Sequence, residues 1–219
     1  MSVTKAGASG AERPRRRYAP RLPPAQRREQ LLDAAFEVTR RSGLHDLSME
    51  AVAAEAGVGK PVLYTVFRTR GDLVSALLDR EYQRAVAQVL ATLPTDMTRT
   101  GPAAAYGGTV TAFVRVVLDN PTRWRLILTG PDDAPSEYRD HLRTARAAIL
   151  DRAVDLARIG IGLEPALAGF DAELLGHTMM SFAEMLGRLA VSDPETYTSD
   201  RLAAYAQALA GLVPAAAAP

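Results

Sequence analysis

The sequence predicts an all-α protein, and three observations support that prediction. Apolar residues recur at three- and four-residue steps along most of the 219 residues, which is the period of amphipathic helices. No segment shows the alternation of apolar and polar residues that is typical of a half-buried strand. Pro, Gly, Asn and Asp separate the periodic segments, as they do at helix ends. A hydrophobic content of 47% is enough for a core, so we expect one or two compact helical domains.

The composition excludes several classes of protein. The chain has no cysteine, which rules out disulfide bridges, cysteine-based zinc sites and a cysteine nucleophile. No apolar run approaches the roughly 20 residues of a membrane span, and no apolar segment follows the N-terminal arginines as it would in a signal peptide. We therefore expect a cytoplasmic protein with no membrane partner.

Charge is distributed unevenly along the chain. Residues 1–80 contain 14 Lys and Arg against 9 Asp and Glu, whereas residues 81–219 contain 12 against 16. Association with a charged partner depends on such local fields more than on the net charge of +1. The first third of the chain is the part suited to a polyanion.

The composition of residues 1–24 predicts a flexible basic arm. Glycine and proline are frequent there and large apolar side chains are nearly absent, so this segment cannot bury enough surface to fold alone. Its Arg15, Arg16 and Arg17 are candidates for contacts with DNA phosphates or the minor groove. A solvated tail that only aids solubility explains the arm equally well.

Four helices are predicted in residues 25–93. The first begins at Ala25 and stops at Gly43. The second follows Ser48, which has the chemistry of an N-cap, and ends at Gly57, where a residue free to take positive φ is useful. The third starts near Gly59 with Pro61 in its first turn and runs through Phe67. The fourth begins at the cap-like Thr69 and extends to about Leu93, and Pro94 closes the domain.

The two short helices have the length and spacing of a helix-turn-helix. The first can cross the DNA backbone while the second enters the major groove, which is about 12 Å wide and distinguishes all four base pairs. Apolar Val52, Val58, Leu63 and Phe67 are expected to hold the pair on the first helix of the domain. Lys60, Tyr64 and Thr65 would then point outward as direct DNA contacts. The alternative, in which Tyr64 is a core aromatic and Lys60 a solvated charge, is less favoured because of the basic bias and the turn chemistry.

Residues 47–67 read LSMEAVAAEAGVGKPVLYTVF, and this segment closely resembles the N-terminal signature of the TetR family of bacterial regulators. The match extends over about 45 residues, and beyond residue 93 it is one of length and helical plan only. The residues that carry it are Ser48, Ala53, Ala56-Gly57-Val58, Leu63-Tyr64, Phe67 and Thr69-Arg70. The resemblance implies a homodimer that binds a palindromic operator in double-stranded DNA. It also implies a small-molecule effector, bound in the C-terminal domain, that releases the DNA from a repressor.

By position, the resemblance also implies roles for single residues. Ser48 would donate a hydrogen bond to a phosphate, Lys60 and Thr65 would reach base edges, and Tyr64 and Arg70 would contact phosphates. The chain departs from the family pattern at Gly59, Pro61, Thr65 and Val66, which predicts an operator different from those commonly described. Pro61 in particular has no N–H to donate from the recognition helix.

Residues 94–219 predict a helical ligand-binding and dimerisation domain. The segments with helical spacing are Pro102–Asn120, Thr122–Leu128, Ser136–Ile159, Asp171–Val191 and Asp200–Val213. Small residues line one face of each of the last two, and we expect these faces to pair with their copies in a four-helix dimer interface. They are Gly176, Met180, Ala183, Gly187 and Ala190, followed by Ala203, Ala206, Ala210 and Val213. Tight packing within one subunit is the alternative.

A ligand pocket in this domain would be lined by large apolar side chains, which adapt to varied ligands. The candidates are Phe113, Trp124, Leu128, Met179, Phe182 and Leu186. Such residues are more often core than binding site, and only the family resemblance favours the pocket. Arg115 and Arg125 are candidates for pairing with an anionic ligand, although a salt bridge explains each more simply.

The sequence features also bear on two rival functions. An all-α enzyme is disfavoured because no catalytic fingerprint occurs, and Glu173 with His177 is the only ligand-like pair, too common to indicate a metal. We therefore expect no enzymatic activity, no cofactor and no metal. An architectural protein that coats DNA with little sequence preference is the second rival, and the ratio of specific to random DNA affinity would separate it from a regulator.

Overall fold

The computed structural model describes residues 22–130 and 136–211, and every regular element in those ranges is helical. This confirms the predicted all-α class. The elements run in the order α1 (Pro24–Ser42), α2 (Met49–Glu55), α3 (Lys60–Val66), α4 (Arg70–Thr92), α5 (Pro102–Asp119), α6 (Pro121–Leu128), α7 (Ser136–Leu163), the 3₁₀ turn η1 (Pro165–Leu167), α8 (Ala172–Ser192) and α9 (Ser199–Ala210). None of the helices in the described ranges is long and apolar enough to cross a membrane.

The predicted turn chemistry sets the helix boundaries of the N-terminal lobe. The Ser48 hydroxyl accepts a hydrogen bond from the Ala51 N–H (3.1 Å) and so caps α2. Gly57 has φ 65°, a conformation that residues with a Cβ rarely adopt, and it turns the chain between α2 and α3. Thr69 and Asp72 form a reciprocal capping box at the start of α4. Local chemistry therefore fixes the lengths of α2 and α3.

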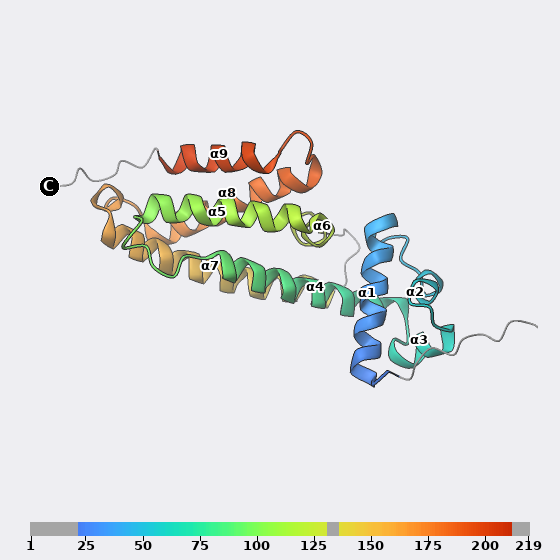
Figure 1. Cartoon of the computed structure of the whole chain (residues 1–219). Helices are drawn as coiled ribbons and strands as arrows, with labels where there is room; N and C mark the ends of the chain where they lie inside the picture. Colours follow the sequence, from blue (N-terminus) through green and yellow to red (C-terminus); the bar gives the residue numbers. More distant parts are fainter. Residues whose placement is uncertain (1–21, 131–135, 212–219) are drawn as a thin grey trace, which may run out of the picture.

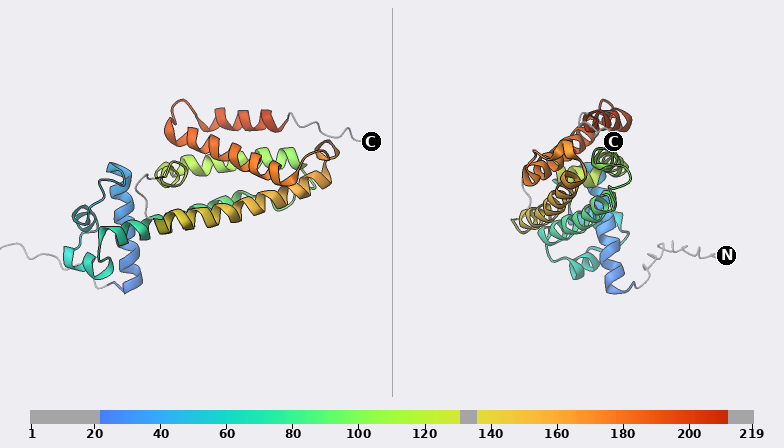
Figure 2. Two further views of the ribbon diagram at one scale, coloured as in Figure 1. Left: turned by 180° about the vertical axis from the view of Figure 1, so that it is seen from behind. Right: turned by 90° about the vertical axis from the view of Figure 1, so that its left-hand side faces the viewer.

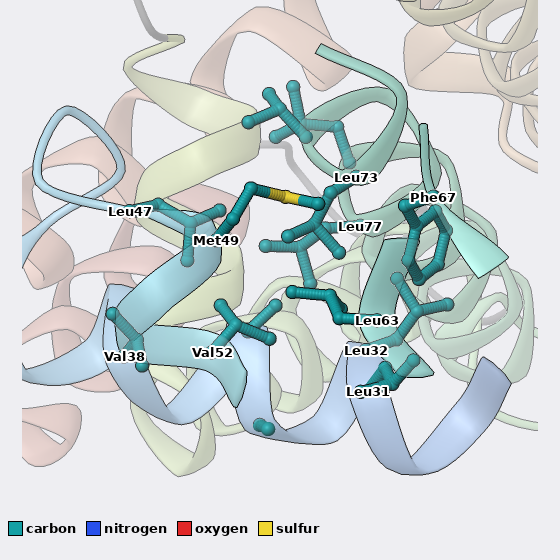
Figure 3. Packing of buried hydrophobic residues seen from close by; sticks show 14 of the residues in the cluster. Leu31, Leu32, Val38, Leu47, Met49, Val52, Leu63, Phe67, Leu73 and Leu77 are labelled. Carbon is teal, nitrogen blue, oxygen red and sulfur yellow. The ribbon is translucent and has the colours of Figure 1, made fainter. Parts of the chain in front are cut away.

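The core of this lobe is a cluster of aliphatic side chains between α1 and the helix pair α2–α3 (Figure 3). Leu32 of α1, Val52 of α2 and Leu63 of α3 are completely buried. Leu73 and Leu77 close the cluster from the first turns of α4. Because one side chain of each short helix is locked against α1, the two helices form one rigid unit.

The C-terminal lobe is a layered helical bundle. Figures 1 and 2 show α4 and α7 side by side at one face, α9 at the opposite face, and α5 and α8 between them. The predicted segments are all helices, but α7 continues past Ile159 to Leu163, and the turn η1 was not predicted. Val213, the predicted end of the last helix, lies outside the described residues.

Helix α4 belongs to both lobes. Its Leu73 and Leu77 are part of the first cluster, whereas Ala85 is part of a second cluster with Phe113, Trp124 and helices α8 and α9. The predicted division at residue 93 stays a prediction. Helix α4 ends before this boundary, but its Ala85 packs with the helices that follow the boundary. A single continuous helix thus connects the two lobes mechanically.

Candidate nucleic-acid interface and inner cavity

The outward face of α3 is formed by the residues predicted to contact DNA. Lys60, Pro61 and Thr65 are exposed, and Tyr64 keeps 46% of its surface accessible. Leu63 is buried and the Phe67 ring lies in the core, as expected for both. The Thr65 hydroxyl donates to the Val62 carbonyl oxygen (2.6 Å), which leaves its lone pairs available to accept from a base edge.

Lys60 has a partner that the sequence did not reveal. Its Nζ lies 2.6 Å from Oε1 of Glu50 in α2, and both side chains are more than half exposed. The hydrogen bond from Lys60 lowers the pKa of the Glu50 carboxyl, so this group is ionised near neutral pH. Glu50 therefore competes with DNA for the Lys60 ammonium.

Replacing Glu50 should strengthen DNA binding. In Glu50→Gln the ammonium of Lys60 is released at the cost of an exposed ion pair, so we expect operator affinity to rise by about two- to fivefold. Fluorescence anisotropy with a labelled operator measures this. Glu37→Gln is the matched control, since Glu37 forms an exposed pair with Arg40 on α1. An equal rise in both variants would mean that only net charge matters.

Arg70, which is predicted to contact a phosphate, has three backbone acceptors within the N-terminal lobe. Its Nε donates to the Leu47 carbonyl oxygen (2.6 Å), and its Nη2 donates to the carbonyl oxygens of Leu44 (2.9 Å) and His45 (3.2 Å). The guanidinium thus holds the turn between α1 and α2 against the start of α4. Only its Nη1 donors are left for the predicted phosphate contact.

Two further residues belong to this surface. Val62 is 37% exposed on α3, and an apolar side chain there can contact a thymine methyl group. Arg68, exposed just after α3, forms no ion pair with any described residue. The basic bias of the segment was the only sequence signal for Arg68. Arg15, Arg16 and Arg17 lie outside the described residues.

The C-terminal lobe contains a cavity of about 660 Å³, bounded by α4 to α9. This volume lies within the range of ligand sites in proteins, about 300–1,000 Å³. Its lining is overwhelmingly apolar. Burial raises the pKa of Tyr82 to about 12 and also raises that of Tyr106, so both phenols are neutral at physiological pH. The Tyr106 hydroxyl already donates to the Met179 carbonyl oxygen (2.8 Å).

Five of the six predicted pocket residues line this cavity: Phe113, Trp124, Leu128, Met179 and Phe182. Leu186 does not line it and is a core residue, 1% exposed in the cluster beneath. Arg115 and Arg125 do not line it either, and Arg125 donates to the Val191 carbonyl oxygen. The charged side chains at the cavity lie on α7 and α8 instead.

Comparisons with known proteins agree with this geometry. The sequence profile described as "Bacterial regulatory proteins, tetR family" matches residues 31–77, which extend from the middle of α1 into α4. Residues 31–77 are thus a TetR-family DNA-binding segment. The chain is 33% identical over 144 residues, 66% of its own length, to the HTH-type transcriptional activator FasR of Mycolicibacterium smegmatis. The chain spans 64% of the length of that relative.

Solved structures share the whole fold. A TetR-like transcriptional regulator from Rhodococcus sp. RHA1 superimposes with a TM-score of 0.66 at 24% identity, covering 87% of this chain and 96% of that one. The regulator FadR of Bacillus subtilis, solved in complex with stearoyl-CoA, gives a TM-score of 0.64 at 16% identity, covering 83% and 96%. At these identities the likeness concerns the fold.

The small residues of α8 pack inside the subunit. A Cβ on Gly176 would lie 2.9 Å from the backbone nitrogen of Val154 in α7, and one on Gly187 would lie 3.0 Å from the Phe113 ring. Ala190, Ala206 and Ala210 are also buried, and Ala183 lines the cavity. These contacts favour the alternative interpretation of the small residues, which is tight packing within one subunit. Close helix packing within one chain needs the same small residues as a dimer interface.

Gly176 should be a stability determinant. Gly176→Ala would push α8 away from the α7 backbone, and we expect a net loss of about 1–2 kcal/mol in the free energy of unfolding, despite the better helix propensity of alanine. Gly108→Ala on α5 is the control, since no heavy atom lies within 4 Å of its added Cβ. That variant should gain about 0.5–1 kcal/mol. Urea denaturation measures the free energy of unfolding of both variants. A gain in stability for Gly176→Ala as well would show that α8 has room for the added methyl group.

A buried charge network joins the two lobes. The Glu81 side chain, 1% exposed on α4, accepts from Arg80 Nε (2.9 Å) and from Arg123 Nε of α6 (2.7 Å). Arg80 in turn donates to Asp33 Oδ1 (2.7 Å) and to the Leu32 carbonyl oxygen (3.1 Å) of α1. Helices α1, α4 and α6 are thereby connected through buried, charge-assisted hydrogen bonds.

Proposed function

We propose that this chain is a sequence-specific DNA-binding transcriptional regulator whose operator affinity falls when a small apolar molecule fills the inner cavity. The exposed face of α3 carries the proposal, with Lys60, Tyr64 and Thr65 presented on a helix whose Leu63 is locked in the core. A rigid helix with three or four polar contacts is what direct readout in the major groove requires. Ser48 and Arg68 are proposed to contact phosphates at the edges of this face.

The route from cavity to DNA is proposed to run through α6. Trp124, Ile127 and Leu128 of α6 line the cavity, while Arg123 of the same helix is bonded to Glu81. A ligand that displaces α6 must shift this buried pair, because a packed charge network cannot stretch gradually. Through Arg80 the shift reaches α1, which supports α2 and α3. The two lobes would then change orientation together.

Selection of bound sequences from random DNA, followed by ligand screening, tests the proposal. We expect one enriched palindrome, bound about 10³-fold or more tightly than random DNA. Apolar molecules that fit about 660 Å³ should release it. The FadR complex with stearoyl-CoA makes long-chain thioesters suitable first probes. Equal affinity for all sequences would instead indicate the architectural DNA-coating protein, and release by no apolar molecule would overturn the ligand-dependent part.

We propose that the homodimer forms through the outer faces of α8 and α9. Leu174 and Met185 of α8 are 68% and 38% exposed, and Tyr205 of α9 is 53% exposed. The Phe182 and Tyr205 rings, 5.9 Å apart, connect the two helices. This outer face of α8 is offset by two residues from the predicted face, which places it on the opposite side of the helix, since each residue rotates the chain by about 100°. Exposed apolar residues of this kind are typical of subunit contacts.

Charges on that face should weaken the dimer. We expect the double variant Leu174→Glu and Tyr205→Glu to raise the dimer dissociation constant by about tenfold or more. Each subunit would bury two unpaired carboxylates in the dimer interface. Sedimentation velocity measures the change. Leu163→Glu, an exposed apolar position at the end of α7, is the control and should leave the dimer intact. Equal weakening by the control would place the interface elsewhere.

A further inference from the structure

The Trp124 indole is a buried polar group of the cavity wall that lacks a hydrogen-bond partner. Trp124 lies on α6, lines the cavity and is 2% exposed. Its Nε1–H is a buried side-chain donor for which the described residues provide no acceptor. In the unfolded chain this N–H bonds to water, so folding loses a hydrogen bond here. A buried donor of this kind in an apolar wall is suited to an acceptor atom of a ligand.

The hydroxyl groups of the cavity wall already donate elsewhere. Those of Thr92, Thr109 and Thr178 donate to carbonyl oxygens of their own helices at distances of 2.7, 2.9 and 2.8 Å. The Tyr106 hydroxyl donates to the Met179 carbonyl oxygen at 2.8 Å. Each of these hydrogens is used within the protein, so these groups have no donor left for a ligand oxygen.

The charged groups of the wall also have partners. The Glu184 carboxylate accepts from Nε and Nη2 of Arg146 at 2.9 and 3.0 Å and lies 3.7 Å from Nη1 of Arg188. Neither Arg143 nor Tyr82 is without a partner. The side chains of Arg146 and Arg188 are 51% and 46% exposed, so water can bond to their other N–H groups. The unpaired donor in the buried part of the described wall therefore lies on α6.

Packing fixes the position of the indole. The Phe113 and Trp124 rings meet edge to face, with centroids 5.1 Å apart and planes at 87°. Gly187 of α8 makes room for this pair, since an added Cβ would lie 3.0 Å from the Phe113 ring and 2.8 Å from Cδ1 of Leu128. The Trp124 N–H thus has one defined position, which favours ligands whose acceptor atom lies at one place along the molecule.

The position of Trp124 couples this donor to the buried charge network. The indole nitrogen has almost no accessible surface, so a ligand oxygen reaches it only when the packing around α6 shifts. The preceding residue, Arg123, donates to Oε2 of Glu81 at 2.7 Å. Consecutive residues of a helix point about 100° apart, so α6 presents one residue to the cavity and the other to the network. A hydrogen bond that forms only after the shift stabilises the shifted state, because a ligand moves an equilibrium through its differential affinity for two states.

We infer that the effector is an apolar molecule with a carbonyl oxygen, and that this oxygen accepts a hydrogen bond from Nε1–H of Trp124 in the shifted position of α6. The inference rests on the proposed function, because it names the ligand class for the same cavity and the same helix. A carbonyl group suits this wall because it accepts a hydrogen bond without bringing a donor of its own, which an apolar wall would leave unpaired.

Isomers of decanone test the position of the oxygen, since they differ only in which carbon carries the carbonyl. The full-length protein is titrated with each isomer by calorimetry and by NMR, where the only tryptophan of the chain gives a single indole N–H signal. We expect one isomer to bind about three- to tenfold more tightly than the others, the effect of one hydrogen bond. That isomer should move the indole proton signal downfield, and decane should not. Equal affinities of all isomers would overturn the inference, including the case in which water keeps the donor.

Trp124→Phe removes the N–H and keeps an aromatic ring. The preference among the isomers should then fall to about twofold or less, whatever the change in absolute affinity. Leu128→Val is the matched control, because it alters the same helix and the same cavity without removing a donor. It should change the affinity for all isomers by a similar factor and keep the preference. A preference that survives Trp124→Phe would overturn the inference. If this variant does not fold, the indole signal of the unmodified protein decides.

Operator release separates this inference from the proposed function. At equal occupancy of the cavity, the preferred isomer should lower operator affinity about threefold or more beyond the effect of the other isomers, measured by fluorescence anisotropy. Equal release by all isomers at equal occupancy would overturn the inference and leave the proposed function standing. Binding of neither decane nor any decanone would count against both.

Discussion

Replacing Lys60 or Tyr64 by alanine is expected to remove specific operator binding. Both side chains are exposed on α3, whose buried Leu63 keeps the helix in place, so neither substitution should disturb the fold. Loss of a base or phosphate contact costs about 1–3 kcal/mol, so each variant should lose about ten- to hundredfold in affinity for the selected operator. Anisotropy titrations against operator and random DNA at fixed salt measure the specific and the non-specific affinity.

The control for that result must remove one exposed positive charge elsewhere. Arg158→Ala on α7 does so, at a residue that forms an exposed ion pair with Asp155. We expect it to keep full operator affinity, and we expect the Lys60 and Tyr64 variants to sediment as dimers because α3 is remote in sequence from α8 and α9. Unchanged operator affinity in both α3 variants would show that another element reads the DNA.

Glu81→Ala should strongly destabilise the protein. The side chain is 1% exposed and accepts from both Arg80 and Arg123, so its removal leaves two buried guanidinium groups without their shared anion. Breaking a buried network in this way costs about 3–5 kcal/mol. For a chain of this size the melting temperature should fall by about 10 °C, measured by circular dichroism or calorimetry.

Glu37→Ala provides the comparison for that measurement. Glu37 also pairs with an arginine, Arg40, but both side chains are 42% or more exposed, and such pairs contribute about 0–1 kcal/mol. Its melting temperature should therefore stay within about 3 °C of the parent. Similar losses for the two variants would mean that water reaches the Glu81 network and that it does not couple α6 to α1 in the way proposed.

The helix-turn-helix could be predicted in detail because its determinants are local. Ser48 caps α2, Gly57 supplies the positive φ, and Thr69 starts α4, each through contacts within a few residues of the chain. The outward direction of Tyr64 follows from the buried position of Leu63 one residue earlier. Arg70 could not be placed in this way, since its acceptors at 44–47 lie more than 20 residues away.

The helices of the C-terminal lobe were predictable from the sequence, but the partner of each helix face was not. Gly176 and Gly187 indicate close helix contacts, which could lie within one subunit or between two subunits. Only the positions of Val154 and Phe113 show that the contacts lie within the subunit. Large apolar residues line the cavity because it is built from core-facing positions, but Leu186 is one that the bundle covers completely. A helical period specifies one apolar face without specifying what covers it.

The sequence by itself thus determined the all-α class, the order of the helices and which residues of α3 are exposed, since periodicity, caps and turns act over a few residues. Only the tertiary structure decided which face of α8 is free, that Arg143, Arg146 and Arg188 share one cavity, and that Glu81 joins α4 to α6. These relations arise where helices distant in the sequence pack together. Their distances depend on the arrangement of whole helices, which no local pattern encodes.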